Sequence, residues 1–138
     1  MVVRIRHLIS ALSPHLRCIA PDLVGFGLSS RPSTFAYTPE AHAGALAEFV
    51  DRLNLERVSL VVHDFGGPIG LPLCLDGTSR VVRLVIMIFA FGPRFLARWE
   101  QLLPQARVLR LADAGHWPHE EAPEEVARAI RAFSLQPA

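Results

Sequence analysis

Two ionisable side chains, Asp64 and His116, occupy positions in this sequence where side-chain chemistry is expected. Asp64 directly follows the apolar run 57–63 and precedes the pair Gly66 and Gly67. An isolated carboxylate at the end of a buried strand is costly unless the backbone is arranged to receive it. A carboxylate held at such a turn can attack carbon as a nucleophile, and a histidine can serve as a general base. The spacing of Asp64 from the following glycines is also consistent with a different role, in which Asp64 only caps the next helix.

The apolar pattern predicts alternating strands and helices that would position these two side chains. We expect strands over 17–23, 57–64, 80–91 and 106–113, and helices over 5–16, 38–54, 68–75, 93–105 and 122–135. Such alternation predicts an α/β fold, with a mostly parallel sheet of about four strands covered by helices on both faces. We expect residues 1–138 to form a single domain.

The two candidate residues fall at the same edge of this expected sheet. Asp64 ends the second expected strand, and His116 follows the fourth. Ligands of open α/β sheets bind beyond the carboxyl ends of the strands, so the pattern brings both residues to the expected site. We expect Gly66 and Gly67 to allow the sharp bend and the close approach of strand and helix, with Pro68 in the first helical turn.

The composition excludes several classes of function. Hydrophobic residues make up 51% and charged residues 20%, and the formal net charge is +1. This balance gives no electrostatic case for binding nucleic acid or an anionic membrane. Arg4 and Arg6 interrupt the first apolar segment, which argues against a signal peptide or a membrane span, so we expect a cytoplasmic protein. We expect Cys18 and Cys74 to be buried free thiols rather than a disulfide.

Several stretches resemble one known family. The stretch VHDFGG (62–67) resembles the nucleophile elbow of α/β-hydrolases that use aspartate, above all the haloalkane dehalogenases. Further stretches resemble that family's loop after an early strand, the strand after the nucleophile helix and the catalytic-histidine loop: HLRCIAPDLVGFGLSSRP (15–32), RVVRLVIM (80–87) and DAGHWPHEEAPEEV (113–126). The resemblance implies an abbreviated α/β-hydrolase fold.

The resemblance also implies a role for each candidate residue. Asp64 would attack a carbon bearing a leaving group and form a covalent ester, and His116 would deprotonate the water that hydrolyses it. The backbone N–H of Phe65 would be one oxyanion donor. The partner would be a small, apolar molecule, with no cofactor and no metal ion.

The sequence also departs from the family pattern. We find no HG-type motif for a second oxyanion donor, and the helical cap of the family is missing, its ends joined near 87–91. The triad acid is not placed, and Asp113 is kept only as a weak substitute. Dehalogenases of the family usually have tryptophan where Phe65 stands. The epoxide-hydrolase branch uses tyrosines of the cap, and the single tyrosine of this sequence, Tyr37, lies before the elbow, which disfavours that branch.

Two other interpretations stay open. The string HWPHEE (116–121) contains metal-ligand types, but Pro118 interrupts a helical spacing, so we do not expect a metal site. The alternative function is a catalytically inactive, truncated α/β-hydrolase remnant. Such a remnant would associate with itself through an uncovered sheet edge.

Overall fold

The computed structural model describes residues 2–76, 80–87, 97–98, 100–101 and 104–136. The described residues leave out most of the helix expected over 93–105. They also leave out the junction expected near 87–91, except for its first residue. Within that helix, 97–98 and 100–101 are helical.

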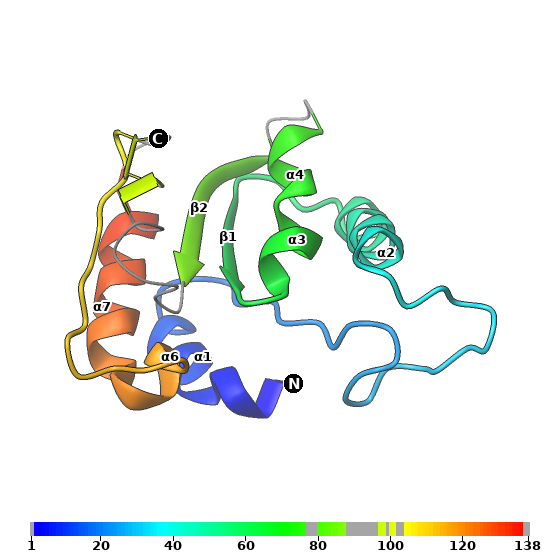
Figure 1. Ribbon diagram of the computed structural model, residues 1–138, viewed down its shortest axis with the longest axis horizontal. Coiled ribbons are helices and arrows are strands. Elements are labelled where there is room, and N and C mark those ends of the chain that lie inside the picture. Colours follow the sequence, from blue (N-terminus) through cyan, green and yellow to red (C-terminus); the bar gives the residue numbers. More distant parts are fainter. Residues whose placement is uncertain (1, 77–79, 88–96, 99, 102–103, 137–138) are drawn as a thin grey trace.

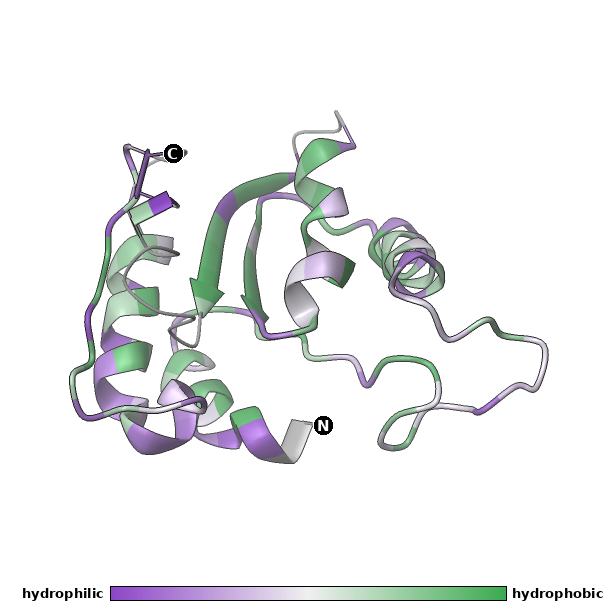
Figure 2. Ribbon diagram, viewed as in Figure 1, coloured by the Kyte–Doolittle hydropathy of each residue, from purple (hydrophilic) through white to green (hydrophobic). Residues whose placement is uncertain are grey.

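A parallel pair of strands forms the centre of the described structure (Figure 1). Strand β1 spans Val58–His63 and strand β2 spans Val81–Met87, with His63 aligned with Met87 at the carboxyl ends. Both runs are apolar along most of their length, as expected for strands covered on both faces, and Figure 2 shows this for β2. The two central strands predicted from the sequence are therefore confirmed.

Helices cover the two faces of this pair. On one face, helix α1 (Arg6–Leu12) packs against helix α7 (Pro123–Ser134), and Leu8, Leu12 and Ile130 form a core with Val61 and Val85 of the strands. A 3₁₀ turn, Val2–Ile5, precedes α1. On the other face, helix α3 (Gly66–Gly70) packs against β1, and helix α2 (Pro39–Arg52) packs on α3 (Figure 1). This is the expected layering of an α/β fold.

The helix boundaries follow local sequence chemistry. The Thr38 side chain accepts a hydrogen bond of 3.2 Å from the Ala41 N–H, and Pro39 occupies the first turn of α2. The helix expected over 68–75 begins earlier, at Gly66, and continues after Leu71 as α4 (Pro72–Leu75). The last helix, α7, starts at Pro123 as expected, and the short helix α6 (Pro118–Glu121) precedes it.

The prediction of two outer strands is wrong. Residues 17–23 and 106–113 have no sheet pairing, so the described residues contain a two-stranded sheet rather than one of four strands. Their apolar side chains still reach the core, since Cys18 and Leu111 pack against it. An apolar run becomes a strand only when a neighbouring strand completes its hydrogen bonds, and the sequence pattern reports burial rather than pairing.

Both cysteines are free, as predicted, but Cys18 is only partly buried and Cys74 is exposed, so the expectation of two buried thiols is wrong. Among the helices of the described residues, none has the length and apolar character that a membrane span requires.

Candidate active site

Asp64 stands at the sharp turn between β1 and α3. Its backbone has a φ of 50°, in the left-handed region that residues other than glycine rarely adopt. The Asp64 carbonyl accepts a hydrogen bond of 2.9 Å from the Gly67 N–H, which closes the turn. The carboxylate projects from this turn with 45% of the side chain exposed. The bend is thus located at Asp64 itself and presents its side chain to solvent.

The glycine that allows strand and helix to approach is Gly70, which corrects the role expected for Gly66 and Gly67. A Cβ atom at Gly70 would lie 2.8 Å from Cγ1 of Val62, closer than real Cβ atoms come to a neighbour. A Cβ atom at Gly66 would meet Val62 only at 3.8 Å, and one at Gly67 would meet no atom of the described residues within 4 Å. The close contact between β1 and α3 therefore depends on the end of the helix.

The structure brings His116 to Asp64. The Nε2 atom of His116 lies 3.6 Å from Oδ2 of Asp64, and both side chains are partly exposed. This distance is longer than a hydrogen bond, so that oxygen of the carboxylate is not held by Nε2 in this arrangement. A base this close to a carboxylate can act on a water that attacks an ester of that carboxylate.

Glu121 holds the main chain on both sides of His116. Its Oε2 accepts a hydrogen bond from the Gly115 N–H, and its Oε1 accepts one of 3.0 Å from the Trp117 N–H. These two bonds lower the pKa of the Glu121 carboxyl. The short helix α6, which begins at Pro118, carries Glu121 back to the loop that it stabilises.

His63 holds the same loop from the sheet. Side chains alternate between the faces of a strand, so His63 points to the same side as Val61, toward the layer of α1 and α7. Its Nε2 lies 2.7 Å from the carbonyl oxygen of His116. A carbonyl oxygen only accepts, so this ring nitrogen carries the proton and donates it.

A cluster of rings packs behind the catalytic candidates. The His63 ring lies 4.9 Å from the ring of His116, 5.0 Å from that of Trp117 and 5.1 Å from that of His119. The guanidinium of Arg4 covers the Trp117 ring at 4.4 Å, a cation–π contact. These contacts extend the packing of the histidine loop against the end of β1.

His119 is the most deeply buried polar residue of this cluster, with 2% of its surface exposed. Its Nδ1 has no hydrogen-bond partner in the described part of the chain. Burial lowers the pKa of His119, and the neighbouring His63 lowers it further. The ring is therefore a neutral packing element and does not share the role of His116.

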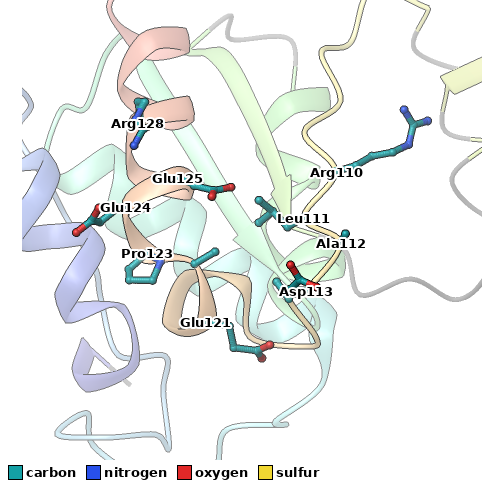
Figure 3. Close-up of a pocket in the computed structure, with 11 residues that line it drawn as sticks. Arg110, Leu111, Ala112, Asp113, Glu121, Pro123, Glu124, Glu125 and Arg128 are labelled. Carbon is teal, nitrogen blue, oxygen red and sulfur yellow. The ribbon is translucent and has the colours of Figure 1, made fainter.

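The remaining predicted residues are placed as follows. Phe65 starts the helical turn after Asp64, and its side chain is 69% exposed. Asp113 lines an open hollow of about 500 Å³ beside α7, together with Glu121, Glu125 and Arg128 (Figure 3). Neither Asp64 nor His116 lines this hollow. Its charged lining is unlike the mostly apolar pockets that small apolar molecules occupy.

Sequence reasoning did not single out Glu121. The capping-box pattern gives no signal for Glu121, because that pattern places the glutamate three residues after the capping residue. Here the capping residue is Trp117, and Glu120 rather than Glu121 stands three residues after it. No three histidine, cysteine or acidic side chains in the described ranges are arranged to hold a metal ion.

Comparison with known proteins places this site in a family. The model of the alpha/beta hydrolase fold family matches residues 2–88. Haloalkane dehalogenase 2 of Mycobacterium tuberculosis H37Rv is 44% identical over 88 residues, which are 64% of this chain and 31% of the relative. The 2-hydroxy-6-oxo-2,4-heptadienoate hydrolase of Pseudomonas putida F1 is 44% identical over 82 residues, 59% of this chain and 30% of the relative.

A solved structure agrees over nearly the whole chain. The crystal structure of an ancestral haloalkane dehalogenase superposes with a TM-score of 0.59 at 25% identity, covering 98% of this chain and 53% of that one. The chain spans about a third of the length of the curated relatives named above. The resemblance to haloalkane dehalogenases is thereby confirmed, and the chain belongs to the alpha/beta hydrolase fold family.

Proposed function

We propose that this chain is a hydrolase that works through a covalent ester on Asp64, with His116 as the base. The observation that carries the proposal is the 3.6 Å separation between the His116 Nε2 and the Asp64 Oδ2, at a carboxylate presented by a left-handed turn. Likeness to enzymes named haloalkane dehalogenase and hydrolase supports the reaction class.

The first step uses Asp64 alone. One carboxylate oxygen attacks a carbon that bears a leaving group, a C–O bond forms, and the bond to the leaving group breaks with its electron pair. The Nε2 atom of His116 stands beyond hydrogen-bond distance of Oδ2, so it does not hold that oxygen back from the attack. The product of the step is an alkyl ester of Asp64 and a free anion.

The second step uses His116. Its imidazole takes a proton from water, and the resulting hydroxide attacks the carbonyl carbon of the Asp64 ester. The Phe65 N–H, which directly follows the ester, would stabilise the negative oxygen of the tetrahedral intermediate. Collapse of this intermediate releases the alcohol, regenerates the carboxylate, and leaves the water proton for release from His116.

The substrate class follows from the resemblance and from the exposed elbow. We propose a small apolar molecule with a halide or a similar leaving group, as the names of the dehalogenase relatives suggest. Phe65 has no side-chain N–H to bind a departing halide, so a good leaving group such as bromide should react better than chloride.

Isotope labelling in a single turnover tests the nucleophile directly. The chain in excess over a simple bromoalkane is allowed to react in water enriched in oxygen-18, and the Asp64 peptide and the alcohol are analysed by mass spectrometry. Nucleophilic attack by Asp64 places the label in the Asp64 carboxylate and leaves the alcohol unlabelled. A labelled alcohol with unlabelled Asp64 would mean that the carboxylate acts as a base on water, and would overturn the proposal.

A further inference from the structure

We propose that His63 and Glu121 are positioning residues that hold the main chain of His116 from two sides and thereby aim its imidazole at Asp64. The inference rests on the proposed function, because it concerns the step in which His116 activates water. The site predictions made from the sequence assigned neither residue this role.

Glu121 fixes the backbone before and after His116. Its two carboxylate oxygens accept from the N–H groups of Gly115 and Trp117, the residues that flank the histidine. Hydrogen bonds to an ionised carboxylate are about twice as strong as neutral ones. The fit is close, since a Cβ atom at Gly115 would lie 3.2 Å from Oε2 of Glu121.

His63 fixes the carbonyl of His116 itself, through the 2.7 Å hydrogen bond from Nε2. His63 also directly precedes Asp64 at the end of β1. One strand end therefore carries the nucleophile and an anchor for the base, so a shift of the loop that changed the Asp64–His116 distance would have to break this bond.

Together the two side chains bind one backbone group on each of three consecutive residues: the Gly115 N–H, the His116 carbonyl and the Trp117 N–H. With these groups held, the position of the main chain from which the His116 side chain projects is set before substrate arrives. A misplacement of about 1 Å can cost roughly 100-fold in rate, so loss of either anchor should be measurable.

The two chemical steps respond differently to such a loss. Alkylation of Asp64 does not use the base, whereas hydrolysis of the ester does. The variants Glu121→Gln and His63→Phe should therefore hydrolyse the alkyl-enzyme about 10-fold or more slowly, with alkylation changed less than about 2-fold. Quenched-flow mass spectrometry of Asp64 with a bromoalkane measures both rates in one experiment.

Matched variants separate hydrogen bonding from packing and charge. Glu120→Gln makes the same charge change in the same short helix, where Glu120 lies 4.0 Å from Arg6, and should leave both rates unchanged. His63→Gln keeps an N–H donor at similar reach and should recover much of the hydrolysis lost in His63→Phe, which keeps the ring. Equal hydrolysis in wild type, Glu121→Gln and His63→Phe would overturn the proposal, as would an equal fall in both steps.

A second readout does not need turnover. The amide protons of Gly115 and Trp117 should titrate together by NMR, following the lowered pKa of Glu121, in wild type and in Glu120→Gln but not in Glu121→Gln. The nuclear Overhauser effect between the His116 ring and the Asp64 β-protons should weaken in Glu121→Gln and in His63→Phe. An unchanged effect in folded variants would overturn the positioning role.

The two readouts distinguish failure of the inference from failure of the proposed function. If no variant forms an alkyl-enzyme, the proposed function fails, and the NMR contacts alone decide whether the anchors hold His116. If the adduct forms and its rate of hydrolysis is the same with and without the two anchors, the proposed function stands and the positioning role fails.

Discussion

The imidazole Nε2 of His116 lies 3.6 Å from the Asp64 carboxylate, although the two residues come from opposite halves of the chain. The strand β1 supplies the carboxylate, and the loop before α6 supplies the imidazole. This relationship is the geometric basis of the proposed hydrolysis, and the predictions below examine the parts of the fold that produce it.

The left-handed turn at Asp64 should cost stability. Replacing Asp64 by glycine removes the side-chain penalty of a φ of 50°, so Asp64→Gly should be more stable than Asp64→Ala by about 1 kcal/mol while both lose the reaction. Urea unfolding followed by circular dichroism measures the difference. Equal midpoints for the two variants would show that the turn is not strained.

The close approach of α3 to β1 depends on Gly70. A methyl group at this position would meet the stiff side chain of Val62, so Gly70→Ala should destabilise the fold by about 1–3 kcal/mol. Gly44, in the middle of α2, is the matched control, because a Cβ atom there would meet no described atom within 4 Å. Gly44→Ala should stabilise by up to about 1 kcal/mol, and a loss at Gly44 as large as at Gly70 would contradict the packing argument.

Truncating a buried side chain in the core between α1 and α7 should leave a cavity and lower the stability of the fold. Ile130 is 4% exposed, and Ile130→Ala should lower the free energy of unfolding by about 2–5 kcal/mol. Leu135, which follows α7 and is 55% exposed, should tolerate alanine within about 0.5 kcal/mol. Similar losses at both positions would argue that α7 does not pack as described.

Buried His119 should make the fold sensitive to mild acid. Its pKa in the folded state is lowered from 6.5 by burial and by His63, and Arg4 adds to this, whereas Glu120 and Glu121 oppose it. The unfolded chain takes up the proton first, so stability should be full above about pH 6.5 and fall as the pH drops from there toward the lowered value. The variant His119→Leu should flatten this part of the pH–stability curve. The same slope in both proteins would refute the assignment.

The fold was largely predictable from the sequence because its strongest signals are local. Thr38 and Pro39 predict the start of α2, and Pro123 predicts the start of α7. The apolar run before Asp64 predicts β1. The outer strands at 17–23 and 106–113 were wrongly predicted, since pairing depends on a neighbour rather than on the run itself.

The candidate site was predictable in its two principal residues but not in their support. Asp64 and His116 are marked by the glycines and the apolar runs around them. No local pattern marks Glu121, because its contact with the Gly115 N–H depends on the conformation of the loop. The role of Gly70 depends on the distance between helix and strand, which the sequence does not encode as a local pattern.

The most direct test of the proposed function is trapping of the ester. Without its base, the variant His116→Ala should alkylate Asp64 and fail to hydrolyse the product. Intact-protein mass spectrometry after incubation with a bromoalkane should therefore show an added alkyl group, absent from the double variant Asp64→Ala, His116→Ala. Folded His116→Ala protein that acquires no alkyl group, or acquires it equally in the double variant, would contradict the nucleophilic role of Asp64.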